Sequence, residues 1–299
     1  RNGLSISKPV PHEEKFFVSS LTAREKQLTG MLVQAGRDGD WSRVVRLWRK
    51  YSGNEVPVYC AAMQAAFYCG QFASAAKMYK KLRGLPGVKP NSVLVHRVLK
   101  IFGKLEKQDE VNNIWSEAVA EGLVDRLVAA ARIEAAASMG DIEGAASGLD
   151  FMIENDLHPE VPAFNAAINA CAKASPPSPS AAVFIYQSML KRGLQPTIVT
   201  FTSLARAHLH ARCASLKTVR SSMNESGMTP DKVFAEAYLA AIFGGNLGPA
   251  EQMSPHVAQM STERQHELHQ ALKAFKASKA MSGLCNEVHK AVRLCRSRN

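Results

Sequence analysis

The residue types that carry out catalysis occur in this chain, but they do not occur at catalytic spacings. His266, Glu267 and His269 approach the His-Glu-x-x-His pattern of zinc proteases, yet the second histidine of that pattern would stand where the chain has Gln270. Two histidines three residues apart on a helix are typical of a solvated surface. This segment therefore predicts an exposed helix and no catalytic metal centre.

Other motifs of catalysis and cofactor binding are missing as well. The glycines of 244–248 follow no predicted strand and precede no Lys, so an inter-helix turn explains them better than a phosphate-binding loop. His208 and His210 stand two residues apart and point to different sides of a helix. The six cysteines form no Cys-x-x-Cys pair, which favours single buried thiols in a reducing compartment. We expect no enzymatic activity, no cofactor, no metal and no small-molecule substrate.

A short sequence that ends a helix occurs four times in the chain, and it indicates which secondary structure carries the polar residues. Each copy has Pro in its fourth position, and the prolines of the last three copies are 37 and 34 residues apart. Self-similarity at this period is the signature of an array of helical hairpins. The copies are residues 87–91, 156–160, 193–197 and 227–231.

One repeat, residues 161–197, shows the local physics. Pro162 stands near the start of a helix, where a missing N–H costs nothing. The Pro-rich stretch 175–179 ends this helix, and a second amphipathic helix follows it. Gly193 suits a left-handed C-terminal cap, and Pro196 prevents continuation. Two short amphipathic helices cannot bury both faces alone, so the unit must stack on copies of itself.

The same template fits most of the chain and predicts an all-α, right-handed α-solenoid. We expect an N-terminal extension over 1–24, about seven repeats over 25–260, and a degenerate helical cap over 261–299. First helices are expected to line the concave side. The predicted helix–turn–helix units are 25–55, 56–91, 92–125, 126–160, 161–197, 198–231 and 232 to about 260.

The segments 164–168 and 199–204, each in a repeat that closes on Gly-x-x-Pro, resemble the pentatricopeptide repeat (PPR) family. The alternative assignment is the tetratricopeptide repeat, an α-hairpin of similar length. That repeat has a Trp early in its first helix, followed by Leu-Gly-x-x-Tyr. No unit here shows that pattern. The resemblance covers about four-fifths of the chain, and it implies single-stranded RNA as a partner and a mitochondrial or plastid location.

Members of this family that bind RNA read one base per repeat with two or three side chains. By resemblance, one reading position lies early in the first helix: Thr29, Cys60, His96, Ala130, Asn165, Thr202 and Glu236. The other follows the end of each repeat: Asn91, Asp125, Glu160, Thr197 and Asp231.

Two of these repeats carry side chains that resemble known readers. Thr202 with Asp231 resembles a guanine-preferring pair, and Asn165 resembles a pyrimidine reader, although Thr197 is a poor partner for it. We expect Asn165, Thr202 and Asp231 to face the groove with partly exposed side chains. Phe164 and Phe201 should be buried between helices.

The net charge of +11 is unevenly distributed. Residues 56–91 carry five basic and no acidic residues, whereas 92–160 carry thirteen acidic and six basic ones. A basic surface indicates a polyanion partner. Nucleic acid is expected at the basic ends and at 161–231, and a basic protein at the acidic hairpins. The candidate phosphate contacts are Lys77, Lys80, Lys81, Lys191 and Arg192.

Two functions of different class remain open. The first is a non-catalytic organellar RNA-binding protein that acts in transcript processing, transcript stability or ribosomal RNA contact. The second is a structural scaffold that joins protein subunits of a larger organellar complex, such as a ribosome or a respiratory complex. No apolar run approaches the roughly 20 residues of a membrane span. The chain begins at Arg1 without a Met; we expect that a targeting peptide has been removed, and an incomplete sequence is the alternative.

Overall fold

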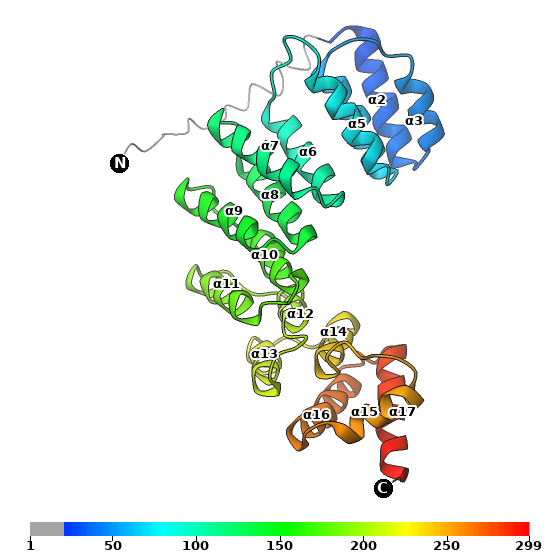
Figure 1. Ribbon diagram of the computed structural model, residues 1–299, viewed down its shortest axis with the longest axis vertical. Coiled ribbons are helices and arrows are strands. Elements are labelled where there is room, and N and C mark those ends of the chain that lie inside the picture. Colours follow the sequence, from blue (N-terminus) through cyan, green and yellow to red (C-terminus); the bar gives the residue numbers. More distant parts are fainter. Residues whose placement is uncertain (1–20, 299) are drawn as a thin grey trace. The chain divides into compact units, whose positions relative to one another are not determined.

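The computed structural model describes residues 21–298, and this part of the chain forms sixteen α-helices and no β-strand (Figure 1). The all-α repeat architecture expected from the sequence is confirmed. The proposed N-terminal extension 1–24 lies outside the described residues except for its last four.

The helices group into two compact units. The first unit contains the described residues up to Met139 together with Gly144–Pro159. Its helix pairs match the first four predicted repeats, although the opening helix starts two residues early. They are α2 (Ala23–Arg37) with α3 (Trp41–Trp48), α4 (Val56–Tyr68) with α5 (Phe72–Arg83), α6 (Ser92–Lys104) with α7 (Gln108–Ala120), and α8 (Arg126–Met139) with α9 (Ile142–Glu154).

The second unit contains Gly140–Glu143 and the described residues from Glu160 onward. Its first three helix pairs match the last three predicted repeats, and one further pair follows them. They are α10 (Val161–Lys173) with α11 (Pro179–Lys191), α12 (Ile198–Ala207) with α13 (Cys213–Glu225), α14 (Lys232–Ile242) with α15 (Ala250–Gln259), and α16 (Thr262–Ala277) with α17 (Gly283–Arg298).

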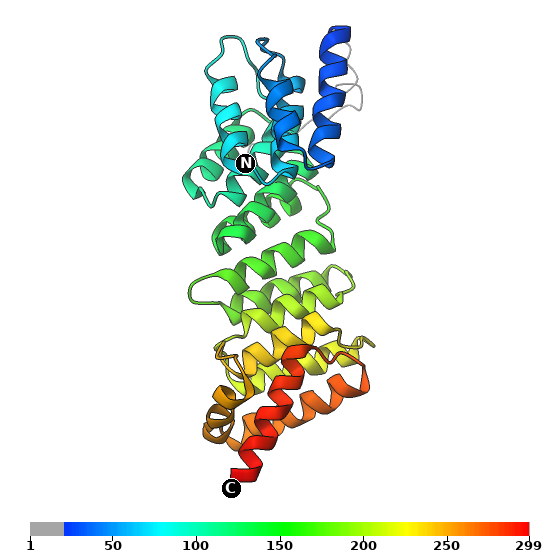
Figure 2. The same ribbon diagram turned by 90° about the vertical axis from the view of Figure 1, so that its right-hand side faces the viewer.

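Each unit is organised by contacts between successive first helices. In the first unit α2 packs on α4, α4 on α6 and α6 on α8; in the second, α10 packs on α12 and α12 on α14 (Figure 2). Helices α3, α5, α7, α11 and α13 each pack on the first helix of their own pair. The result is a row of first helices covered by second helices within each unit.

Small residues allow the first helices to approach closely. A Cβ atom added to Gly36 of α2 would lie 2.5 Å from the Cα of Ala65 in α4. A Cβ added to Gly103 of α6 would lie 2.7 Å from the Cα of Ala135 in α8. Both distances are shorter than carbon atoms tolerate, so backbone lies directly against backbone at these two crossings.

The repeat ends behave as their residue types require. Gly193 and Gly227 adopt positive φ angles of 73° and 71°, a left-handed conformation that glycine reaches without strain. The aromatic residues between the helices are buried as expected, with Phe164 1% and Phe201 0% exposed. These ends turn the chain back so that the next first helix can stack on the previous one.

The C-terminal helices depart from the simple repeat. Helix α16 packs on both α13 and α14, whereas α15, which contains Pro255, packs on α17. Residues 232–260 and 261–299, which the sequence assigns to a repeat and a separate cap, are therefore interleaved in space. The boundary at residue 260 stays a prediction, but helix packing crosses it.

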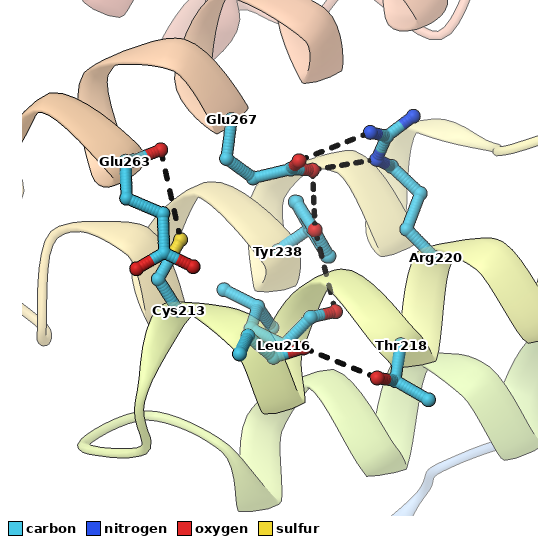
Figure 3. A network of polar contacts seen from close by, with 8 residues as sticks. Cys213, Leu216, Thr218, Arg220, Tyr238, Glu263 and Glu267 are labelled. Carbon is cyan, nitrogen blue, oxygen red and sulfur yellow. Dashed lines mark hydrogen bonds and ion pairs between the residues drawn. The ribbon is translucent and has the colours of Figure 1, made fainter.

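A buried charge cluster holds α16 in this place (Figure 3). Glu267 of α16 is 2% exposed and accepts two hydrogen bonds from the Arg220 guanidinium of α13, at 2.7 and 3.1 Å. Tyr238 of α14 donates to the same carboxylate at 2.7 Å. Burial and the Glu267 carboxylate both raise the pKa of Tyr238, so its hydroxyl keeps its proton. The helix around Glu267 is exposed at His266, as expected, but this carboxylate lies on its other side as a buried link between three helices.

Replacing Gly103 by Ala should destabilise the first unit by about 1–3 kcal/mol, because the added methyl group would force α6 away from α8. Gly30 is a matched control, since it also lies inside a helix but has no atom within 4 Å of an added Cβ. Gly30→Ala should stabilise by roughly 0.5–1 kcal/mol. Urea unfolding gives the change in the free energy of unfolding for each variant. Similar changes in the two variants would contradict the close contact between α6 and α8.

Replacing Glu267 by Ala should cost about 3–5 kcal/mol, because the Arg220 charge would stay at a partly buried site without its partner. The control is Gln270→Ala on the exposed side of α16, which should stay within about 0.5 kcal/mol of the parent. The measurement is chemical denaturation followed by circular dichroism. A loss no larger than that of the control would show that the cluster does not hold α16.

Candidate nucleic-acid interface

The residues that follow the repeat ends are the N-caps of the first helices. The Asn91 Oδ1 accepts from the backbone N of Leu94 at 2.8 Å, and the Asp231 Oδ1 accepts from that of Phe234 at 2.7 Å. Asp125 caps α8 in the same way. These side chains therefore hold the start of a helix, and only their remaining polar atoms can face a ligand.

The early first-helix positions lie five residues after these N-caps. They fall on one register in α4, α6, α8, α10, α12 and α14: Cys60, His96, Ala130, Asn165, Thr202 and Glu236. In α2 the predicted residue is Thr29, whose hydroxyl is buried and makes no hydrogen bond. The structure thus gives the two predicted sets a regular spacing along each first helix.

Thr202 does not have the exposed side chain that we expected. It is 5% exposed, and its hydroxyl donates to the backbone oxygen of Ile198 at 2.8 Å in its own helix. The hydroxyl bonds back to the preceding turn because neighbouring helices cover it. Asp231, its expected partner, is exposed and caps α14. The guanine-reading role of this pair stays a prediction.

His96 lies half-buried on α6 of the first unit. Burial lowers the pKa of its imidazole, and the nearby cations Lys100 and Arg97 lower it further. At neutral pH the ring is therefore uncharged and offers one donor and one acceptor.

Asn165 lies half-buried in a polar network that links two repeats. Its Oδ1 accepts from the hydroxyl of Thr200 at 2.6 Å, and its Nδ2 lies 3.4 Å from the Thr197 hydroxyl. Thr200 in turn accepts from the backbone N of Thr197 at 2.9 Å, which completes a capping box at the start of α12. Asn165 and Thr197 are thus brought together as the sequence predicted, through a third residue that it did not identify.

An exposed aliphatic side chain two residues after the N-cap was also missed. Leu127 in the first unit is 57% exposed, and in the second unit Val199 is 55% and Val233 51% exposed. Positions two and five after the N-cap are three residues apart and share a helix face. The signal was available in the sequence as an aliphatic residue at a fixed offset, but only the structure shows that it is exposed.

One stretch of the second unit is strongly basic. Residues 161–224 contain seven basic residues and no acidic one. Arg220 is neutralised by Glu267. The other six side chains are all exposed: Lys173, Lys191, Arg192, Arg206, Arg212 and Lys217.

Two of these cations share a face with the candidate readers. Arg206 lies seven residues after Val199 on α12, and Lys173 lies eight after Asn165 on α10, spacings that return to the same side of a helix. We define the first-helix face of the second unit as Asn165, Lys173, Val199, Arg206 and Val233. It combines a polar amide, exposed aliphatic groups and two positive charges.

The predicted phosphate contacts lie on second helices instead. Lys77, Lys80 and Lys81 belong to α5, and Lys80 forms an ion pair with Glu110 of α7 at 2.9 Å. The Lys81 ammonium lies 5.9 Å from the ring centroid of Trp48. Lys191 and Arg192 are exposed at the end of α11.

Acidic side chains of α7 form ion pairs with basic side chains of the same chain. Glu110 pairs with Lys80, and Glu117 pairs with Arg83 at 2.9 Å, so α7 binds the basic helix of the preceding pair. The sequence predicted a basic protein partner for the acidic hairpins. Glu110 and Glu117 pair with basic side chains of this chain, and the protein partner stays a prediction.

Residues 21–298 have neither a cluster of metal ligands nor a membrane-spanning helix. No group of three His, Cys, Asp or Glu side chains is placed to hold a metal ion there. No described helix has the length and apolar character needed to cross a bilayer.

These helix pairs, with one polar register repeated along the first helices, define an α-helical repeat protein. No family model matches the chain. A pentatricopeptide repeat-containing protein of Arabidopsis thaliana is 27% identical over 199 residues, which cover 64% of this chain and 33% of that protein.

Two crystal structures resemble the fold. The pentatricopeptide repeat protein PPR10 from maize gives a TM-score of 0.58 at 18% identity, over 99% of this chain and 43% of that chain. PPR10 in complex with an 18-nucleotide psaJ RNA element gives 0.54 at 17% identity, over 98% of this chain and 52% of that one.

The resemblance to the pentatricopeptide repeat family is therefore confirmed, and the chain has the all-α repeat architecture of that family. It spans about a third to a half of the length of these relatives.

Proposed function

We propose that this chain is a non-catalytic organellar protein that binds single-stranded RNA through the first-helix face of its second unit. The observation that carries the proposal is that this face combines exposed Lys173 and Arg206 with exposed Val199 and Val233 and the polar amide of Asn165, and that residues 161–224 contain no acid. PPR10, a similar fold, has been crystallised with RNA.

The chemistry of this face suits a single strand. Lys173 and Arg206 can neutralise phosphates, which supplies most of the sequence-independent affinity. Val199 and Val233 offer apolar surface to the faces of unstacked bases, and Asn165 offers hydrogen bonds to a base edge. Glu236 is exposed on α14, so positive potential is strongest over α10 and α12.

Transcript processing, transcript stability and contact with ribosomal RNA are all compatible with such binding, in a mitochondrion or a plastid. Each needs only that the protein occupies an RNA segment. Catalysis is not required of this chain in any of them.

Reversing both charges of Lys173 and Arg206 to Glu should weaken binding of an unstructured 18-nucleotide RNA. Each lost phosphate contact should reduce the slope of log K against log salt by about 0.7. Fluorescence anisotropy between 50 and 300 mM salt measures this. Equal affinity and slope before and after the change would contradict the proposed face.

The matched control reverses Lys191 and Arg192, an equal number of exposed charges on α11. Since α11 is a second helix, these changes should alter the slope less than those at Lys173 and Arg206. Identical effects of the two pairs would mean that RNA senses only the net charge. A double reversal at Lys80 and Lys81 extends the comparison to the ion-paired α5.

One observation favours the scaffold function as a second candidate. Phe184 on α11 is 72% exposed and Leu190 is 43% exposed, which is unusual for large apolar groups. Lys191 lies seven residues after Phe184, on the same side of the helix, and Arg192 follows it. We name Phe184, Leu190, Lys191 and Arg192 the α11 patch.

The α11 patch suits a protein subunit that presents an acidic amphipathic helix. Such a partner would bury its apolar side on Phe184 and Leu190 and place carboxylates near Lys191 and Arg192. Because the patch lies on a second helix, it leaves the first-helix face free for RNA. One protein could then bind RNA and a subunit of a larger complex together.

The probe is a labelled amphipathic peptide that has a stripe of Leu residues flanked by Glu. Replacing Phe184 by Ser should raise the Kd of this peptide at least tenfold, a loss typical of an interface anchor. The fold should be unaffected, since the side chain is exposed. The control peptide has Ser for Leu and the same charge. Equal binding of both peptides would reduce the patch to a site of non-specific charge attraction.

A further inference from the structure

Thr200 is a polar residue at a position that is apolar in α4, α6, α8, α10 and α14. It lies three residues after the N-cap of α12 and is fully buried. The corresponding residues of the other first helices with an aligned N-cap are Val58, Leu94, Val128, Ala163 and Phe234. A buried hydroxyl is unfavourable unless it is hydrogen-bonded, so its occurrence in this one repeat calls for a partner.

That partner is the candidate reader of the preceding repeat. The Thr200 hydroxyl lies 2.6 Å from Oδ1 of Asn165 and 2.9 Å from the backbone N of Thr197. The backbone N–H can only donate, so it occupies a lone pair of the hydroxyl oxygen. The Thr200 hydroxyl has one proton to donate, and Asn165 Oδ1 at 2.6 Å is a closer acceptor than the Thr197 hydroxyl at 3.3 Å, so the proton is directed to Asn165 Oδ1.

This arrangement fixes which way the Asn165 carboxamide points. Its oxygen is held toward the start of α12 by Thr200, and its Nδ2 can donate toward the Thr197 hydroxyl and toward solvent. Asparagine is the residue at the reading register only in this repeat, and threonine occurs at the buried register only in the next one. Asn165 and Thr200 therefore form one hydrogen-bonded pair that joins two repeats.

We infer that Thr200 is a positioning residue, which holds Asn165 as a hydrogen-bond donor toward the base. This inference rests on the proposed RNA-binding function. Asn pairs with adenine through both its oxygen and its nitrogen, as an acceptor and a donor side by side. Because Thr200 holds the oxygen toward the start of α12, the oxygen cannot face the base edge beside Nδ2, and that two-bond contact is lost. A ring nitrogen of adenine and a carbonyl oxygen of uracil can each still accept one bond from Nδ2. Adenine therefore loses the second bond that a free carboxamide would give it, and the preference of this repeat shifts toward uracil.

Thr200→Val tests this pair, because valine has nearly the same shape and stands at this register in two other repeats. The probes are rU18 and rA18, measured by anisotropy with the full chain. The ratio of the two affinities should fall by roughly threefold to tenfold in favour of rA18, since one hydrogen bond sets the preference. Thr200→Ser, which keeps the hydroxyl, should restore the parent ratio.

A double-mutant comparison separates positioning from general damage to the fold. Asn165→Ala should lose the same discrimination, and adding Thr200→Val to it should change the ratio no further. A Thr200→Val effect that persists without Asn165 would overturn the inference. An unchanged ratio in Thr200→Val would overturn it as well. Thermal unfolding of each variant verifies that the chain remains folded.

The side-chain amide of Asn165 provides a readout that needs no RNA. In ¹⁵N–¹H spectra its NH₂ group should give one ordered, slowly exchanging pair of signals, which shift and exchange faster in Thr200→Val but not in Thr200→Ser. If neither RNA binds the parent chain, the proposed function and the reading role both fail. Loss of order at Asn165 in Thr200→Val would still distinguish that result from a wrong assignment of Thr200.

Discussion

The close approach of consecutive first helices is the constraint on which the rest of the structure depends. Gly36 meets Ala65 and Gly103 meets Ala135 with backbone against backbone, and no larger residue fits at either glycine. Each first helix can then pack on the next within its unit, and the second helices complete the cover. Because successive first helices are side by side, residues at one register become neighbours, which turns a sequence period into a face that can bind a ligand.

The same few residues serve both the helices and the candidate site. Asn91 and Asp231 begin first helices by accepting backbone N–H groups, so their identity is already restricted by capping. Thr200 shares this double use, since it completes the capping box of α12 and holds Asn165. A polar residue at a repeat boundary is therefore not by itself evidence for ligand contact. Evidence comes from exposed neighbours that capping does not require, such as Val199 and Arg206.

Charge is divided in a way that total composition hides. In the first unit, basic and acidic side chains meet on neighbouring second helices, as in Lys80 with Glu110 and Arg83 with Glu117. Exposed pairs of this kind add little stability, but they cancel the local potential. In the second unit, residues 161–224 contain basic residues and no acidic one. Of these basic residues, Arg220 forms an ion pair with Glu267. A polyanion would therefore be attracted to residues 161–224, which contain seven basic and no acidic residues, more strongly than the net charge of +11 spread over the whole chain suggests.

The sequence by itself determined the helix pairs, their period and the register of the candidate readers, because turns and helix ends depend on local residues such as Gly193 and Pro196. It could not show that Thr202 is covered, that Glu267 is buried, or that Lys80 is paired, since each depends on a helix far away in the chain. The packing of α16 on α13 and of α15 on α17 was equally hidden. Tertiary structure decided these points because burial and ion pairing are properties of neighbours in space.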